Sequence, residues 1–358
     1  MSRPTRALIH TTALQHNLLQ ARQHNPGSKI MAVVKANAYG HGTVAAAKAL
    51  SGADAFGVAS IEEALVLRDA GIVQPITALE GFFESSELPY FVDHHIQAVI
   101  HSPWQLELLE GFPDKDKLGI WIKIDTGMNR LGFPLSDAAP VVERVRKWAG
   151  KDQISLMSHL ACADDLHSKS TQSQIEHFSD LVSNYDLPAS LSNSAGIVGW
   201  PASRHQWARP GIMLYGSSPI SRQSAHDLGL KPAMTFTSEL ISVNHRRRGD
   251  AVGYGGDWIC PEDMAVGVVA AGYGDGYPRH AQPGTPVLIR GKPAPIIGRV
   301  SMDMITVDLR HKQDAVVGDE VVLWGNGLSV DTVAEHAGTI SYELLCHVTQ
   351  RVPRIEVS

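Results

Sequence analysis

The chain has 358 residues, of which 31 are Lys or Arg and 37 are Asp or Glu, so its formal net charge is −6. This length suggests about two domains, and a hydrophobic share of 44% against 19% charged indicates a large buried core. A negative net charge does not favour binding to nucleic acid. No apolar run reaches the roughly 18 residues that a membrane-spanning helix needs. The first ten residues lack the apolar stretch of a secretory signal, and three cysteines are too few for a disulfide scaffold. We therefore expect a cytoplasmic protein.

From residue 30 onward, short apolar runs alternate with helix-like patterns. The runs are 30–34, 55–59, 76–79, 97–100, 118–124, 154–158, 189–192 and 206–209. Most of them are too continuous for strands with only one buried face, which is typical of buried parallel strands. Eight such units predict an N-terminal (β/α)8 TIM-like barrel within an α/β chain. A doubly wound open sheet is the alternative.

After about residue 228 the pattern changes to runs rich in Val, Ile and Thr, separated by Gly, Pro and Asp. The runs are 233–243, 264–271, 286–290, 303–309 and 320–324, and two helical patterns follow at 330–337 and 342–347. This pattern predicts a mainly β C-terminal domain. We place the barrel at 10–227 and the β domain at 228–358.

The segment Val33–Gly42 places Lys35 directly after the first buried strand. Barrels keep their active sites at this end of the strands. A desolvated lysine there can act as a Schiff-base nucleophile. The alternative is a lysine that extends into solvent from the strand end. The polar Asn37 and Tyr39, together with two glycines, favour the functional interpretation.

The fifth and sixth runs also end in residues that can carry chemistry. Arg130 can bind a substrate carboxylate in a bidentate pair, and Lys123 faces inward if the strand alternates. The alternative is a structural ion cluster of Lys123, Asp125 and Arg130. His159 is a candidate functional residue only because it also lies at the carboxyl end of a predicted strand.

The seventh and eighth runs lead into Ser192–Gly196 and Arg209–Ile212, each of which opens a helix. Exposed backbone N–H groups and the Ser194 hydroxyl make an anion site there, and barrels commonly hold phosphate in these two loops. The chain has no nucleotide-binding motif. A phosphate site with a strand-end lysine therefore predicts pyridoxal phosphate.

In the β domain, three segments stand out: Val252–Gly256, Gly272–Tyr277 and Arg299–Met304. Tyrosines flanked by glycines commonly cap a sheet at a turn, and this is the structural alternative for them.

Taken in order, these segments resemble bacterial alanine racemases over nearly the whole chain. The matching segments are Ala32–Gly42, Lys123–Gly132, Ser158–Asp164, Trp207–Gly216, Val252–Gly256, Gly272–Tyr277, Gly298–Asp303 and Arg351–Arg354. The resemblance implies a barrel that binds pyridoxal phosphate, followed by a β domain to which residues 1–9 add a strand. It also implies a homodimer whose active sites are shared between the subunits.

The resemblance implies roles for individual residues. Lys35 would be the Schiff-base lysine and the base for D-alanine, and Tyr254 from the partner would be the base for L-alanine. Arg130 and the partner's Met302 would hold the substrate carboxylate. The residues around the cofactor phosphate would be Tyr39, Ser194, Gly211, Ile212 and Tyr342.

Further residues would tune the site. Arg209 would face the pyridine nitrogen, His159 would support both Arg209 and Tyr254, and Lys123 aligns with a lysine that can be carbamylated. Residues of the narrow substrate entrance would be Asp164, Tyr273 and Arg299.

The implied activity is interconversion of L- and D-alanine by two bases, which supplies D-alanine for peptidoglycan. The alternatives are a racemase of broader specificity, a pyridoxal-phosphate homeostasis protein and a decarboxylase of the same architecture. The residues after 228 argue against the homeostasis protein, and Arg209 disfavours the decarboxylase. We expect no metal, nucleic-acid or membrane partner.

Overall fold

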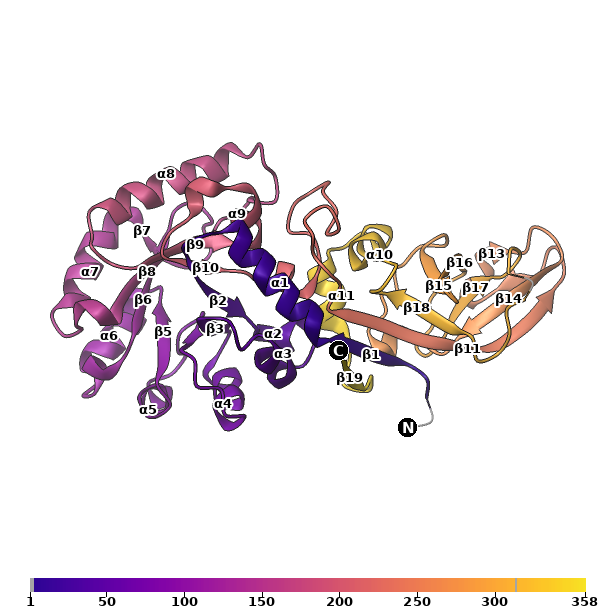
Figure 1. Ribbon diagram of the computed structural model, residues 1–358, viewed down its shortest axis with the longest axis horizontal. Helices are drawn as coiled ribbons and strands as arrows, with labels where there is room; N and C mark the ends of the chain where they lie inside the picture. The colour runs from indigo at the N-terminus through magenta and orange to yellow at the C-terminus, as the bar shows by residue number, and fades with distance from the viewer. Residues whose placement is uncertain (1–2, 313) are drawn as a thin grey trace.

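The computed structural model describes residues 3–312 and 314–358 and has two lobes along one long axis (Figure 1). The barrel lies at the left of Figure 1 and the β domain at the right. The chain begins in the β domain with β1 (Arg6–His10) and then enters the barrel with α1 (Thr11–His24).

Eight parallel strands form the barrel. They are β2 (Lys29–Val33), β3 (Ala55–Val58), β4 (Ile76–Ala78), β5 (Ile96–Ile100), β6 (Ile120–Asp125), β8 (Ile154–Met157), β9 (Ala189–Asn193) and β10 (Trp207–Arg209). Their spatial order is β5-β4-β3-β2-β10-β9-β8-β6, and β5 also pairs with β6. This last pairing closes the sheet, so the predicted (β/α)8 barrel is confirmed and the open sheet is wrong. A two-residue strand, β7 (Phe133–Pro134), lies beside β6.

Helices connect the strands and cover the outside of the barrel (Figure 1). They are α2 (Lys35–Tyr39), α3 (Thr43–Ala49), α4 (Ile61–Asp69), α5 (Leu88–Asp93), α6 (Pro103–Gly111), α7 (Ala138–Arg146), α8 (Lys169–Ser183) and α9 (Ser194–Gly199). Local signals explain their limits. For example, α8 begins after Ser168, whose hydroxyl accepts a hydrogen bond from the Thr171 N–H.

Alternate side chains of the strands point into the barrel. Met31 and Trp121 belong to a small buried cluster that is separate from the main core. The Trp121 Nε1 donates to Gln97 Oε1 at 2.9 Å, which satisfies polar groups in this interior. Because strands repeat every two residues, Val33 and Lys123 share this interior face, one layer nearer the carboxyl ends.

The β domain is a mainly antiparallel sheet, and the expected β C-terminal domain is confirmed. Its strands are β1, β11 (Met234–Arg246), β14 (Met264–Val269), β15 (Pro286–Ile289), β16 (Lys292–Ile297), β17 (Ile305–Asp308), β18 (Glu320–Trp324) and β19 (Arg354–Val357). The order is β14-β17-β16-β15-β18-β11-β1-β19, and β14 also pairs with β11, so the sheet returns on itself. As the resemblance implied, β1 adds to this sheet, antiparallel to β11 and parallel to β19. The exact division at 227/228 stays a prediction.

Some strands escaped sequence reasoning. Strand β16 contains Pro293 and Pro295, which normally argue against a strand, yet its first four residues pair with β15 and its last two pair with β17. The hairpin of β12 (Ala251–Val252) and β13 (Trp258–Ile259) is too short to show a period. The two late helical patterns form α10 (Val330–Ala337) and α11 (Ser341–His347).

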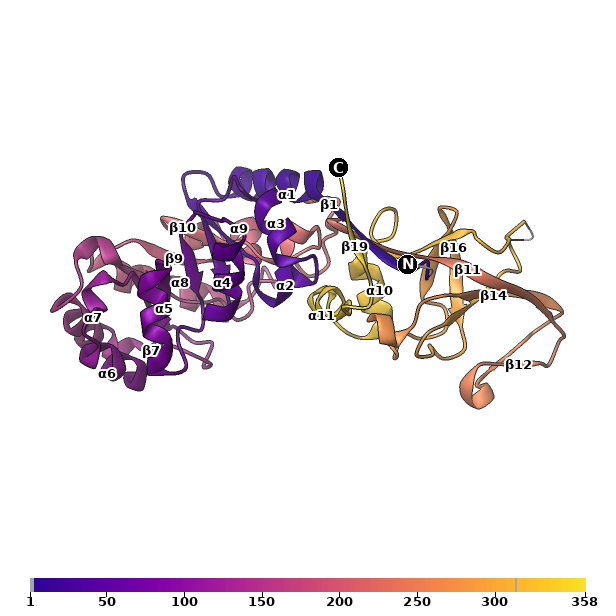
Figure 2. The same ribbon diagram turned by 90° about the horizontal axis from the view of Figure 1, so that it is seen from below.

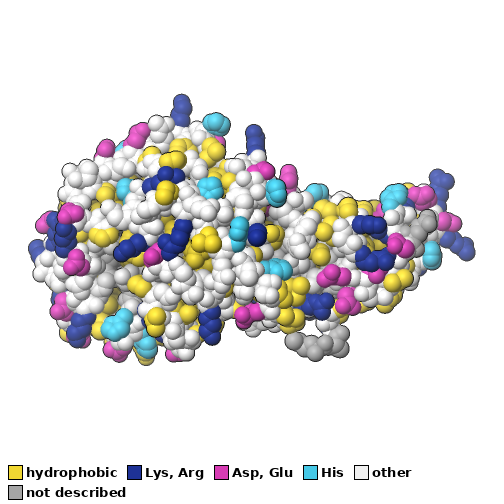
Figure 3. Space-filling model, in the orientation of Figure 1, with side chains coloured by type: hydrophobic (Ala, Val, Ile, Leu, Met, Phe, Trp, Pro, Cys, Tyr) yellow, Lys and Arg dark blue, Asp and Glu magenta, His cyan; other side chains and the backbone are white. Residues whose placement is uncertain are grey.

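Helices α10 and α11 lie between the barrel and the β sheet in both views (Figures 1 and 2). Helix α11 contacts α2, and a Cβ at Gly40, the residue after α2, would collide with the Leu345 carbonyl. Charged side chains of both signs are scattered over the face in Figure 3. Within the described ranges, no helix is long and apolar enough to cross a membrane.

The link between the lobes makes one glycine hard to replace. Gly216 has φ +81°, and a Cβ there would collide with the Lys231 carbonyl. Gly71 has nearly the same φ, +82°, but nothing lies within 4 Å of its Cβ position. We expect Gly71→Ala to lower the free energy of unfolding by about 1–2 kcal/mol through strain alone. Gly216→Ala should lose about 1–3 kcal/mol more through overpacking. Urea unfolding midpoints of the two variants test this, and equal losses would contradict it.

Candidate active site

A cavity of about 530 Å³ opens at the carboxyl ends of the barrel strands. Ten residues singled out in the sequence line it: Lys35, Tyr39, Lys123, Arg130, His159, Ser194, Arg209, Gly211, Ile212 and Tyr342. Nine belong to the barrel, and Tyr342 comes from α11 in the C-terminal part of the chain. We call this cavity the barrel pocket.

Lys35 begins a one-turn helix, α2, that is left-handed. Residues 36–39 have φ between +50° and +55°, although none of them is glycine. This region is sterically unfavourable for residues with a Cβ, and such strain persists only where the surroundings hold it. The turn brings the side chains of both Lys35 and Tyr39 to the barrel pocket. We name residues 36–39 the left-handed turn.

Tyr39 is held by a second aromatic ring. The Tyr215 ring stacks on it with centroids 4.6 Å apart, and the Tyr215 hydroxyl donates to the Val33 carbonyl at 2.8 Å. The Tyr342 ring lies 6.0 Å from that of Tyr39. Burial raises the pKa of Tyr39, and it raises the pKa of Tyr342 to about 12. Both hydroxyls therefore stay protonated at neutral pH and can donate to an anion.

The loops after β9 and β10 form an anion cradle. Ser194 begins α9, and its Oγ accepts a hydrogen bond from the Gly211 N–H at 2.9 Å. A Cβ at Gly211 would collide with the Tyr39 hydroxyl, so only glycine permits this approach. The segment after Arg209 opens a helix as expected, which is the short 3₁₀ helix Ile212–Tyr215. Ser194, Gly211 and Ile212 lie where the sequence predicted a phosphate site.

Arg209 and His159 form a polar pair at the base of the barrel pocket. Arg209 is buried and donates from Nη2 to the Ser158 carbonyl at 2.6 Å and to His159 Nδ1 at 3.4 Å. Burial lowers the pKa of Arg209 to about 10, so the guanidinium remains charged at neutral pH. Burial, then the charge of Arg209 and three further cations, lower the pKa of His159 to about 3. His159 is therefore neutral, with the proton on Nε2, because Nδ1 accepts from an arginine.

The barrel pocket gathers positive charge. Burial, and then Arg209, Arg130 and Lys35, lower the pKa of Lys123 to about 8. Among the described residues, no carboxylate forms an ion pair with any of these four cations at 4 Å or less. Asp125 instead accepts three backbone N–H groups of the loop that follows it. The alternative of a Lys123–Asp125–Arg130 ion cluster is therefore wrong, and the pocket suits an anionic ligand.

Five predicted site residues lie outside the barrel pocket of their own chain, and four of them belong to the β domain. Tyr254 is 70% exposed and follows the short strand β12, which projects away from the sheet in Figure 2. Met302 is 52% and Tyr273 38% exposed, and Arg299 forms an ion pair with Asp257. Tyr277, by contrast, is buried in the β domain, as a turn tyrosine would be.

Asp164 lines a neighbouring cavity that shares Tyr342 and His159 with the barrel pocket. Its carboxylate accepts a hydrogen bond from the Ser221 hydroxyl at 2.9 Å, and its carbonyl accepts one from the Ser221 N–H. Asp164 is thus tied to the segment that links the two lobes.

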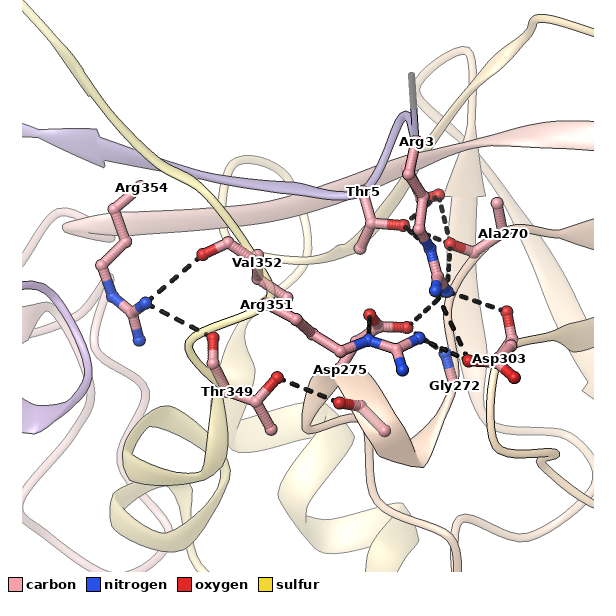
Figure 4. Close-up of polar contacts among 12 residues, drawn as sticks. Arg3, Thr5, Ala270, Gly272, Asp275, Asp303, Thr349, Arg351, Val352 and Arg354 are labelled. Atoms are coloured by element: carbon pink, nitrogen blue, oxygen red, sulfur yellow. Dashed lines mark hydrogen bonds and ion pairs between the residues drawn. The ribbon is translucent and has the colours of Figure 1, made fainter. Parts of the chain in front are cut away.

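A charged cluster holds the loops that carry Tyr273 and Met302 (Figure 4). The buried Asp275 carboxylate accepts from Arg3 and Arg351 at 2.7 Å and from the Gly272 N–H at 2.9 Å. The Gly274 N–H in turn donates to the Met302 carbonyl at 2.8 Å. The cluster joins the two loops to both ends of the chain, so it sets how they face outward.

Sequence reasoning missed some residues of the barrel pocket. Glu80 and Leu79 line it after β4, and Leu131 and Met157 complete the wall. Glu80 could have been found, because it follows a predicted strand end as Lys35 does. The other three are apolar and carry no signal that separates them from core residues.

Two family models match the chain. "Alanine racemase, N-terminal domain" matches residues 9–219, and "Alanine racemase, C-terminal domain" matches residues 233–356. The alanine racemase of Coxiella burnetii (strain RSA 493 / Nine Mile phase I) is 49% identical over 363 residues and covers 100% of both chains. The alanine racemase of Photobacterium profundum is 50% identical over 349 residues and covers 97% of each chain.

Solved structures agree with these matches. Biosynthetic alanine racemase from Pseudomonas aeruginosa is 44% identical, with a TM-score of 0.97, over 99% of this chain and 100% of that one. Alanine racemase from Bartonella henselae with covalently bound pyridoxal phosphate is 28% identical, with a TM-score of 0.89, over 99% of each chain.

Removing the charge of Asp275 should loosen the β domain. We expect Asp275→Asn to lower the free energy of unfolding by about 2–4 kcal/mol, since the buried acceptor of two arginines is lost. The matched control is Asp303→Asn, because Asp303 contacts the same arginines but its side chain is 48% exposed. The control should cost clearly less, because solvent screens an exposed ion pair. Denaturant unfolding measures both, and similar losses would show that Asp275 is no more important than a surface carboxylate.

Proposed function

The chain belongs to the alanine racemase family, and we propose that its barrel pocket interconverts L-alanine and D-alanine with pyridoxal phosphate. The observation that carries this proposal is Lys35 beside an anion cradle, in a pocket with four cations and no paired carboxylate among the described residues. One similar structure, from Bartonella henselae, holds this cofactor covalently.

The residues of the barrel pocket fit pyridoxal phosphate. The cradle of Ser194, Gly211 and Ile212, with the protonated hydroxyls of Tyr39 and Tyr342, would bind the phosphate. Lys35 would hold the cofactor covalently through its Nζ. The fixed cation of Arg209 would face the pyridine nitrogen and, as a donor only, leave it unprotonated. When bound, the cofactor would supply an electron-withdrawing ring that makes the α-hydrogen of alanine acidic.

Arg130 would bind the alanine carboxylate, together with the backbone of the partner's Met302. Lys123 lies in the same pocket, and its pKa of about 8 leaves a share of neutral amine near pH 8. A neutral lysine amine adds to carbon dioxide and releases a proton, and the resulting carbamate would be an anionic partner for Arg130. Such a carbamate would replace the positive charge of the half-buried Lys123 with a negative one beside three other cations.

Racemisation needs one base on each face of the α-carbon. Lys35 can remove or return the proton on one face. The two tyrosines of the same pocket are poor second bases, because burial raises their pKa values. Tyr254 is exposed on its own chain, so it is available to a second copy. The proposal is therefore a homodimer in which each pocket receives Tyr254 from the partner.

His159 would support that second base. Its Nδ1 accepts from Arg209, so its Nε2–H is free to donate to the oxygen of Tyr254 from the partner. The hydrogen bond and nearby cations favour the ionised tyrosine. Residues Asp164, Tyr273 and Arg299 would line the entrance between the subunits.

The cellular role follows from relatives. The Pseudomonas aeruginosa structure is described as biosynthetic, which supports supply of D-alanine for peptidoglycan. The match of a whole C-terminal family domain argues against a pyridoxal-phosphate homeostasis protein. The cytoplasmic location of the protein stays a prediction.

Lys35→Ala should abolish covalent attachment of the cofactor. Borohydride reduction of the loaded wild type, followed by peptide mapping, should label only the peptide that contains Lys35. The matched control is Lys29→Ala, since Lys29 lies at the opposite end of the same strand, over Trp207. Borohydride reduction of the control should label the same peptide as in the wild type. A label on any other peptide would refute the assignment of Lys35.

Tyr254→Phe should separate the two bases. Since the enantiomers have equal free energy, kcat/KM falls equally in both directions, and steady-state rates cannot identify the base. Exchange of the α-hydrogen with D2O can. In this variant Lys35 should still exchange the α-hydrogen of D-alanine. The exchange rate of the α-hydrogen of L-alanine should fall by about 10²–10⁴-fold. The control is Tyr90→Phe, because Tyr90 is also an exposed tyrosine. This variant should exchange the α-hydrogens of both enantiomers as the wild type does. Equal exchange from both enantiomers in Tyr254→Phe would refute its role.

Mixed dimers test whether Tyr254 crosses to the partner. A dimer of one Lys35→Ala chain and one Tyr254→Phe chain would hold one doubly damaged site and one intact site. Such heterodimers should recover up to half the activity of the wild-type dimer. No recovery in purified, cofactor-loaded heterodimers would place both bases on one chain.

A further inference from the structure

His41 is a buried histidine that follows the left-handed turn in the chain, after Gly40, and does not line the barrel pocket. Its side chain is 1% exposed, and burial lowers its pKa to about 4. The Nδ1 lies 2.8 Å from the Tyr39 carbonyl oxygen and 3.0 Å from that of Ala38. Carbonyl oxygens only accept, so Nδ1 carries the proton and donates to both. Among the described residues, Nε2 has no hydrogen-bond partner.

The left-handed turn needs such support. Four successive residues without glycine occupy a region that costs each about 1–2 kcal/mol. The first of them is held by Glu63, whose carboxylate accepts from the Ala36 N–H at 2.8 Å. The last two are held by His41 through their carbonyls. The beginning and the end of the turn are therefore fixed by different side chains.

The His41 ring also supports Tyr39 indirectly, through the ring of Tyr215. The Tyr215 ring lies between them, with its centroid 4.6 Å from that of each neighbour. The next residue of the chain, Gly40, is fixed by the Arg354 Nε–H, which donates to its carbonyl at 2.6 Å. Arg354 also donates to carbonyls near the C-terminus, including those of Thr349 and Val352 (Figure 4).

We propose that His41 is a positioning residue: its Nδ1–H holds the left-handed turn that presents Lys35 and Tyr39 to the cofactor. This inference rests on the proposed use of pyridoxal phosphate. Without the donor, the turn would relax toward less strained backbone conformations, and only a fraction of molecules would keep the binding geometry. The apparent dissociation constant rises as that fraction falls.

Two substitutions at this position separate the hydrogen bond from packing. His41→Asn keeps an N–H donor close to the place of Nδ1, whereas His41→Leu fills the space without a donor. We expect His41→Leu to weaken binding of pyridoxal phosphate to the apoenzyme by about tenfold, the loss of one buried hydrogen bond. His41→Asn should recover most of that affinity. Absorbance titration of apoenzyme measures the dissociation constant, and thermal unfolding of the apoenzyme measures stability.

The matched control is His205→Leu. His205 packs edge-on against Phe178, has an Nε2 without a partner among the described residues, and precedes β10 at the opposite end of the barrel. It should lower the melting temperature without changing cofactor affinity. Unchanged affinity in His41→Leu, or equal losses in His41→Asn and His41→Leu, would overturn the inference. Failure of the wild type to bind pyridoxal phosphate would instead refute the proposed function.

Discussion

The pairing of β5 with β6 closes the barrel, and the barrel pocket depends on this closure. Parallel strands all present their carboxyl ends at the same rim, so residues far apart in sequence converge there. Lys35 follows β2, whose paired neighbour β10 ends in Arg209, and both residues line one cavity. Glu80 after β4 and Lys123 on β6 line the same cavity, although without the pairing of β5 with β6 they would lie near opposite ends of the strand order. Closure therefore assembles the site.

The charge of the barrel pocket follows from this convergence. Four cations meet at the carboxyl ends of the barrel strands, and the charge of the other three helps to lower the pKa of Lys123. Like charges in a low-dielectric space are costly without an anion. The protein keeps Asp125 occupied with backbone N–H groups rather than pairing it with these cations. A phosphate and a carboxylate would supply the missing negative charge, which links the electrostatics to the proposed ligands.

The β domain contributes to the pocket of its own chain, and in the proposed dimer it would also contribute to the pocket of the partner. Within the chain, α11 delivers Tyr342, and Arg354 fastens the carbonyl of Gly40. Toward a second copy, exposed loops carry Tyr254, Tyr273 and Met302, and the Asp275 cluster holds two of these loops. In the proposed dimer, these exposed loops would bring the second base to the face opposite Lys35.

The sequence by itself determined the eight barrel strands and the chemistry at their ends. Buried parallel strands leave continuous apolar runs, and Lys35, Lys123 and Arg209 interrupt or end such runs. Tertiary structure decided the left-handed turn, because alanine and tyrosine have no local preference for positive φ. Glu63 holds the first residue of the turn, and Arg354 fixes the carbonyl of Gly40 directly after it. Tertiary structure also decided β16, since two prolines obscure its pattern. These features depend on contacts between residues far apart in the chain, and such contacts leave no period in the sequence.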